Sequence, residues 1–270
     1  MKRLLIGTLS CLLASGLPAL AQADKRPSPS AEEIINRHLE AAGGRERLSQ
    51  FKSRIAIGTI RKESDPESRV AIMSESPNRF AAVYVLPAYD LRFIYDGSKG
   101  IMRPQLPRGF AAFDSKYREM AASGLMFNGI SLYNLLLRPP ADAKFEAKGV
   151  KKVQGRDAYV VEVKRPKTDA MRLYFDADTF MWVRTDYGKA HVTREMRPFS
   201  NDPVNHSADE LTVDFFIETS DFREVSGVKL PFKFQQVVTA PLLRQSANGL
   251  ITGTISEYRH NEQIDPNMFQ

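Results

Sequence analysis

Cysteine is almost absent from this sequence. The single cysteine is Cys11, close to the N-terminus. It lies in an apolar segment that we expect to be removed, so the mature chain would contain no cysteine. Without thiols, neither disulfide bonds nor thiolate nucleophiles are available to the mature chain. A chain of this length can bury a core large enough to fold without such cross-links. The shortage therefore argues against a disulfide-stapled scaffold and a cysteine-dependent enzyme.

The sequence motifs of metal, phosphate and nucleophile chemistry are missing as well. No GxSxG elbow, glycine-rich phosphate loop or HExxH helix occurs. SxxK occurs at Ser49–Lys52 and Ser226–Lys229, but without the SDN and KTG partners of a penicillin-binding site. The four histidines are scattered, at no spacing suited to a shared metal ion: His38, His191, His206 and His260. We predict no catalytic residue, no metal site and no cofactor, and hence a protein that is not an enzyme.

The N-terminal segment has the pattern of a secretory signal peptide over Met1–Ala21. Lys2 and Arg3 precede an apolar stretch, Leu4–Leu20, and Ala19–Ala21 offers a small-x-small cleavage site. The apolar stretch is short for a membrane span and is followed by polar sequence with prolines, which disfavours the alternative of an uncleaved anchor. We therefore expect a periplasmic protein, since secretion without disulfides suits that compartment.

A strong excess of either charge is also lacking. The formal net charge is +6, and it falls to +4 if Lys2 and Arg3 leave with the signal, because no acid leaves with them. This charge is too small and too dispersed to predict nucleic-acid binding, although it favours anionic lipid surfaces. We expect residues 22–30 to form a flexible lead and residues 31–270 to form one domain, as a monomer.

The clearest helix in the mature chain is predicted over Ser30–Gln50. Ser30 and Glu33 fit a capping box, and Gly43 and Gly44 end the first, longer part of the helix. An apolar stripe at helical spacing runs along it: Ile34, Ile35, Leu39 and Ala42. His38 lies on the stripe, where we expect a packed histidine and not a ligand. A helix of this length needs a surface to cover.

Most of the remaining chain is predicted to form β-strands. Four strands are expected between residues 51 and 95, and the others follow between residues 145 and 258. The longest pair is Leu211–Glu224 with Lys229–Val238, and another turn is predicted at Tyr187–Gly188. Roughly ten or eleven strands without a βαβ rhythm predict one antiparallel sheet, which at that size must twist and curl.

One apolar segment interrupts the strands at Asp114–Leu137. Prolines bound it on both sides, and Gly124 and Gly129 break its helical pattern. We predict a helical lid insertion around residues 110–138 that, with the first helix, covers the concave side of the sheet.

Three pieces of the sequence together resemble a known family. They are the opening IINRHLEAAGGRERLSQFKSRIAIGTI and two hairpins, YFDADTFMWVRTDY and DFREVSGVKLPFKF. The ending, Ile264–Phe269, is similar too. The chain resembles the LolA/LolB-like periplasmic superfamily of outer-membrane lipoprotein-sorting proteins. The resemblance implies a single curved antiparallel sheet, an incomplete (half) β-barrel with α-helices over its concave side. The superfamily binds lipoprotein acyl chains or other lipids in that concavity.

The residue pattern and the family resemblance both predict a carrier that binds lipid or lipoprotein acyl chains without a covalent step. A periplasmic sensor or regulator that uses the same fold to bind a partner protein or lipid signal is the alternative. In either role, the expected partners are lipid or lipoprotein acyl chains and an inner- or outer-membrane protein. The residues expected to line the apolar cavity and lid are Ile57, Phe80, Tyr84, Phe93, Met120, Leu125, Met126, Phe127, Leu132, Phe215 and Phe232. Any one of them could instead complete the core.

Overall fold

The computed structural model describes residues 29–62, 66–85, 90–96, 100–103, 112–113, 130–139, 141–165, 170–194, 209–239 and 249–270. The predicted signal peptide and most of the predicted lid insertion lie outside these residues. Among the residues described, no helix is both long and apolar enough to span a membrane.

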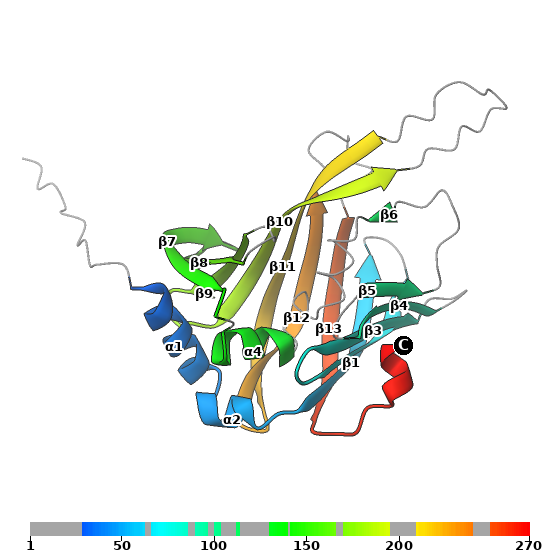
Figure 1. Cartoon of the computed structure of the whole chain (residues 1–270), viewed down its shortest axis with the longest axis horizontal. Coiled ribbons are helices and arrows are strands. Elements are labelled where there is room, and N and C mark those ends of the chain that lie inside the picture. The colour runs from blue at the N-terminus through cyan, green and yellow to red at the C-terminus, as the bar shows by residue number, and fades with distance from the viewer. Residues whose placement is uncertain are drawn as a thin grey trace, which may run out of the picture.

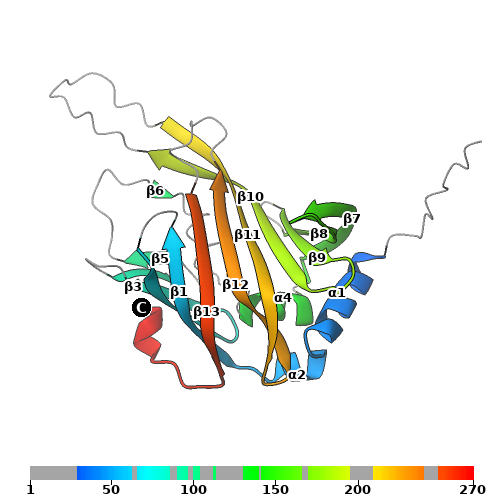
Figure 2. The same cartoon turned by 180° about the vertical axis from the view of Figure 1, so that it is seen from behind.

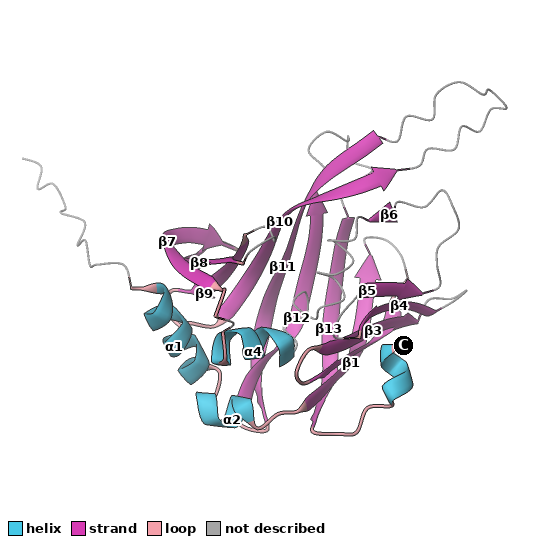
Figure 3. Cartoon of the chain, in the orientation of Figure 1, coloured by secondary structure: helices cyan, strands magenta, loops and turns pink. Residues whose placement is uncertain are grey.

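Strands dominate the described chain and form one antiparallel sheet (Figures 1 and 3). They are β1 (Ser53–Lys62), β2 (Ser68–Glu75), β3 (Arg79–Val85), β4 (Asp90–Tyr95), β5 (Gly100–Arg103), β6 (Ala112–Phe113), β7 (Lys144–Val153), β8 (Arg156–Lys164), β9 (Met171–Asp176), β10 (Trp182–Arg194), β11 (Asp209–Val225), β12 (Val228–Thr239) and β13 (Gly249–His260). Their order in space is β5-β4-β3-β2-β1-β13-β12-β11-β10-β9-β8-β7, with β6 beside β10. Because this order has two ends, the sheet is open, and the predicted mainly-β, curved architecture is confirmed.

The predicted N-terminal helix forms as two helices, α1 (Ala31–Ala41) and α2 (Arg45–Ser49). The Ser30 hydroxyl accepts a hydrogen bond from the Glu33 backbone N–H at 3.1 Å, as expected of the predicted N-terminal cap. The whole predicted stripe is buried, and His38 lies buried within it. The Nδ1 atom of His38 donates to the Phe180 carbonyl oxygen at 3.0 Å, and burial lowers the pKa of His38 to about 4.

The corner between α1 and α2 is joined to the hairpin between β11 and β12. The backbone N–H of Lys229 donates to the Ala42 carbonyl oxygen at 2.9 Å, and Arg47 donates to the Gly227 carbonyl oxygen at 3.2 Å. Gly43 has a φ of 124°, and a Cβ there would lie 2.5 Å from the Gly227 oxygen. Only glycine satisfies both constraints.

The three helices α1, α2 and α4 (Ile130–Leu137), here called the covering helices, lie on the concave side of the sheet (Figure 1). Seen from behind, α4 lies beyond strands β11 and β12 (Figure 2). The covering helices enclose one buried cluster with β7–β9 and the hairpin end of β12. On the other side of the sheet the C-terminal 3₁₀-helix η2 (Pro266–Phe269) closes a smaller cluster with β2, β3 and β4.

Strand β10 departs from the sequence prediction. The turn predicted at Tyr187–Gly188 is wrong, because β10 continues from Trp182 to Arg194. Its pairing with β11 shifts register between Asp186 and Lys189, and Gly188 has a φ of 72°. Glycine therefore marks a β-bulge here and not a reversal of the chain. The short strands β5 and β6 were not predicted either.

Candidate functional site

The concave side carries a second buried cluster, here called the concave cluster, beside the one under the covering helices. It is built from strands that are far apart in sequence: Ala56, Ile60, Val70, Ile72, Phe80, Ala82, Tyr84, Tyr187, Ile217, Phe234 and Ile255. Side chains that are only partly buried border it: Leu91, Phe93, Tyr95, Met171, Ile251 and Tyr258. A curved sheet thus gathers aromatic and aliphatic groups over one hollow, part of which stays accessible.

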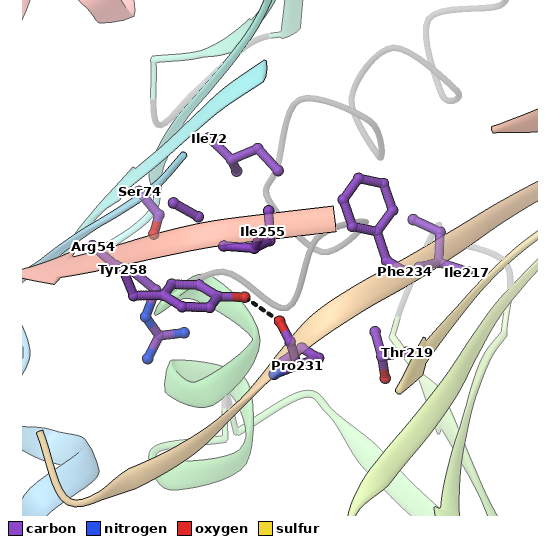
Figure 4. Close-up of a pocket in the computed structure, with 10 residues that line it drawn as sticks. Arg54, Ile72, Ser74, Ile217, Thr219, Pro231, Phe234, Ile255 and Tyr258 are labelled. Carbon is purple, nitrogen blue, oxygen red and sulfur yellow. Dashed lines mark hydrogen bonds between the residues drawn. The ribbon is translucent and has the colours of Figure 1, made fainter. Parts of the chain in front are cut away.

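A pocket opens within the concave cluster (Figure 4). Its lining is Arg54, Ala56, Ile72, Ser74, Ile217, Thr219, Pro231, Phe234, Ile255 and Tyr258. The cavity measures about 20 Å³, which is room for about one water molecule. The described side chains therefore nearly fill the hollow, and a larger guest would need them to part.

One wall of the pocket depends on Gly253 of β13. A Cβ at Gly253 would lie 2.1 Å from the Cζ atom of Phe234, so the aromatic ring lies directly on the glycine backbone. Phe234 and Gly253 are directly paired across β12 and β13. Glycine in a strand often marks such a close approach. The ring keeps its place only because this position has no side chain.

The polar end of the pocket is formed by Arg54, whose side chain belongs to a residue only 4% exposed. Its Nε atom donates to His260 Nε2 at 3.1 Å, and its guanidinium carbon lies 5.3 Å from the centre of the Tyr133 ring on α4. Burial lowers the pKa of Arg54, while the neighbouring Tyr133 and Tyr258 act in the opposite direction. A cation thus lies at the join between β1 and a covering helix.

Two neighbours of Arg54 stay neutral. Burial, and secondarily the charge of Arg54, lowers the pKa of His260 to about 4. Burial raises the pKa of Tyr258, whose hydroxyl donates to the Pro231 carbonyl oxygen (Figure 4). Among the described residues that line this pocket, Arg54 is accordingly the one with a charged side chain.

Three of the predicted cavity residues lie in or against the concave cluster. Phe80 and Tyr84 are buried members of it, and Phe93 borders it, meeting Tyr84 edge to face with ring centres 5.6 Å apart. Phe232 is buried next to the pocket, edge to face with Tyr258 at 5.3 Å. The structure brings these four aromatic residues to the concave side or its border.

Ile57 lies on the opposite side of the sheet. It pairs with Ala71, and the neighbouring Ile55 and Ala71 pack against the cluster under η2. Because side chains alternate along a strand, Arg54 and Ala56 face the pocket and Ile57 does not. The predicted alternation along β1 is therefore correct. Both faces of the strand are covered, however, and the more apolar residues, Ile55 and Ile57, lie on the face away from the concave side.

Two more of the predicted residues belong to described elements. Leu132 belongs to α4 and Phe215 to β11, where its backbone pairs with Val238. The remaining predicted residues lie outside the part of the chain that the structure describes: Met120, Leu125, Met126 and Phe127.

A second hollow, of about 340 Å³, lies against the other face, between the β7–β8 and β9–β10 turns and β11. It is larger than the concave pocket, but charged groups line it, among them Arg156 and Asp176, whose ion pair measures 3.0 Å. Asp176 also accepts from the Thr179 backbone N–H at 2.8 Å, as expected of a turn-forming aspartate. Such a lining does not suit an apolar guest, so the concave pocket is the better candidate.

Metal chemistry finds no support in the described ranges, where no group of three or more His, Cys, Asp and Glu residues could hold an ion. The protein groups at the concave pocket are aliphatic and aromatic side chains, two hydroxyl residues, a tyrosine and Arg54. This arrangement can bind an apolar or amphiphilic molecule.

No family model matches the chain, and no curated protein matches it. Solved structures do resemble it. A LolA superfamily protein from Nitrosomonas europaea is 14% identical, with a TM-score of 0.48 over 90% of this chain and 98% of that one. An outer membrane lipoprotein-sorting protein domain from Vibrio parahaemolyticus is 10% identical, with a TM-score of 0.45 over 87% and 97%.

A DUF1329 family protein from Desulfovibrio piger is 12% identical, with a TM-score of 0.44 over 89% of this chain and 95% of that one. Identities this low concern the fold alone. A LolA superfamily protein and a lipoprotein-sorting protein domain are thus among the solved structures to which this chain is similar.

Proposed function

We propose that this protein is a periplasmic binding and carrier protein for lipid or lipoprotein acyl chains. The proposal rests on one observation: large apolar side chains from seven strands converge on the concave side, and several at its border remain partly exposed. A surface of this kind is unfavourable in water unless a guest or partner covers it. Burial of an acyl chain contributes about 0.8 kcal/mol per CH₂ group, so a long chain can be held without polar contacts.

Loading requires the pocket to widen, because it now has room for about one water molecule. Helix α4 is the covering element best suited to move, because the corner between α1 and α2 is hydrogen-bonded to the β11–β12 hairpin. It has eight residues, and a helix of that length is only marginally stable by itself in water. In the proposed mechanism α4 is displaced, the acyl chain enters, and the loaded protein passes it to a membrane or receptor.

Native mass spectrometry of the protein isolated from its own periplasm tests this proposal. We expect co-purified lipid, identified after extraction, in the wild-type protein. Ile251→Glu introduces a carboxylate at the border of the concave cluster, and we expect it to abolish lipid retention. Val150→Glu is the matched control, since Val150 is 48% exposed on the edge strand β7, away from the concave cluster. We expect this variant to retain its lipid.

Equal retention in both variants would contradict a concave binding site. A wild-type protein that is free of lipid but carries a stoichiometric protein partner would favour the alternative, a sensor or regulator of the same fold.

A further inference from the structure

We infer that the outer edge of strand β7 binds an extended, acidic segment of a partner protein, which adds to the sheet as one more strand. Binding of this kind takes its affinity from main-chain hydrogen bonds and its specificity from alternate side chains. None of the described residues of the concave pocket belongs to β7, so this role goes beyond the proposed function. Strand binding and lipid retention are therefore separate readouts.

Strand β7 lies at one end of the sheet and has an open edge (Figure 1). It pairs with β8 on one side, and no other described strand pairs with it. It is ten residues long, whereas β5 at the opposite end of the sheet has four. Val153 alone of its residues is buried. A long edge of this kind presents a row of N–H and C=O groups that a further strand can bond.

The concave side of β7 carries apolar side chains. Phe145 and Ala147 pack against the cluster under the covering helices. Val150 pairs directly with Tyr159, which packs against the same cluster, because a β-bulge between Ala147 and Val150 adds one residue and restores the face. Val150 is 48% exposed, more than any other large hydrophobic side chain that the structure describes. An added strand could cover it with an apolar side chain of its own.

The opposite face of β7 is basic. It carries Lys144, Lys148 and Lys151, and Glu146 is the one acidic residue of the strand. Lys148 forms ion pairs with Glu146 at 2.8 Å and with Glu162 of β8 at 3.4 Å. These two carboxylates therefore offset the charge in the middle of the strand.

Lys144 and Lys151 lie towards the two ends of the strand, and neither forms an ion pair within the described part of the chain. Lys144 lies directly opposite Lys164 of β8, an arrangement in which like charges repel. Carboxylates on a neighbouring strand would pair with both lysines. A second copy of β7 would instead bring further lysines to the edge, so the edge favours an acidic strand over a copy of itself.

The two faces together specify the sequence pattern of the partner. Side chains alternate between the faces along a strand. Acidic side chains of the partner should therefore lie beside Lys144 and Lys151, and apolar ones beside Val150. The expected segment alternates acidic and apolar residues.

The simpler explanation is that the lysines and the bulge only prevent this edge from pairing, as such features do in many sheets. In that case no peptide should form an ordered strand on β7. The inferred role predicts an ordered strand, and it predicts that binding depends on the order of the side chains as well as on their charge.

The experiment is a binding titration of the purified protein with three labelled peptides of equal length, about eight residues. One alternates glutamate and valine, and one alternates lysine and valine. The third has the composition of the first, with its glutamates and valines in two blocks. We expect the first to bind at least about tenfold more tightly than either of the others. Hydrogen–deuterium exchange should slow at the amides of Lys144–Val153 when it binds.

Four results would each overturn the inference and leave the lipid-binding proposal intact. They are equal affinity for the alternating and block peptides, tighter binding of the lysine peptide, protection of amides elsewhere than on β7, and no binding of any peptide.

Charge reversal at the edge is the second test. Lys144→Glu combined with Lys151→Glu should weaken binding of the glutamate–valine peptide by about tenfold and strengthen binding of the lysine–valine peptide. Lys229→Glu combined with Lys233→Glu is the matched control, because both lysines are exposed on β12 and the change in charge is the same. An equal change in both double variants, or no change in either, would contradict binding at β7.

Discussion

The concave side of this sheet has two halves that differ in how they are covered. Under the covering helices, Leu39, Phe175 and Trp182 are almost completely buried. In the concave cluster the bordering residues Phe93 and Ile251 stay partly exposed. One sheet thus provides a sealed core where the described helices lie over it and an accessible apolar surface where they do not.

The largest difference between the two halves is expected in stability. Trp182 is 1% exposed and fills the covered half, so Trp182→Ala should lower the free energy of unfolding by about 3–5 kcal/mol. Phe93→Ala should cost clearly less, because its side chain is only partly buried. Urea denaturation followed by circular dichroism measures both. Similar losses in the two variants would remove the distinction between core and site.

The next largest effect is a dependence on pH that belongs to the covered half. The folded-state pKa of His38 is about 4, below the ordinary 6.5, because burial disfavours the charged form. The unfolded state therefore binds a proton more readily, and stability is lost as pH falls from 6.5 towards 4. For this one group we expect a loss of about 2 kcal/mol between pH 7 and pH 5.

Denaturant unfolding at a series of pH values measures this loss. His38→Gln should flatten the profile between pH 7 and pH 5. The burial of His260, whose pKa is also lowered to about 4, should leave a residual slope. A profile that is unchanged by the substitution would mean that His38 is accessible to protons in the folded state.

The smallest effect on stability is expected at Gly253, in the concave cluster. Gly253→Ala forces the Phe234 ring away from β13 and towards the pocket, because the new Cβ would overlap the far end of the ring. We expect the free energy of unfolding to fall by about 1 kcal/mol, as is typical when a side chain is added to a well-packed core. Lipid retention should fall strongly.

Phe234→Leu combined with Gly253→Ala is the control, since the shorter side chain removes the overlap. Lipid retention, measured by extraction from each purified variant, should return in the double variant. Retention that stays normal in Gly253→Ala would place the guest elsewhere.

Local patterns in the sequence predicted most of the elements. The Ser30 cap, the buried stripe of α1 and the β11–β12 hairpin depend on neighbouring residues, and all three are confirmed. The continuity of β10 could not be predicted, because a glycine signals a turn and a bulge equally well. Which of the two occurs depends on the partner strand β11, which is distant in the sequence.

The site was less predictable than the elements. Aromatic residues in strands pointed to Phe80, Tyr84 and Phe93, and the structure gathers these around the concave cluster. Arg54 was missed because it alternates with Ile55 and so read as part of an outward face. The one sequence feature that indicated an inward face for Arg54 is the small residue Ala56, which lies next to it on the same face of β1. A small side chain suits the concave side of a curved sheet, where side chains are crowded. A sequence alone does not say which side of a strand curves inward.

The bonded corner between α1–α2 and the β11–β12 hairpin has a consequence for how the chain is made. Its two parts come from opposite ends of the sequence, so the corner cannot close until the hairpin has been synthesised. Until then the apolar stripe of α1 has no docking partner at this corner, and the growing chain is open to aggregation or to a chaperone.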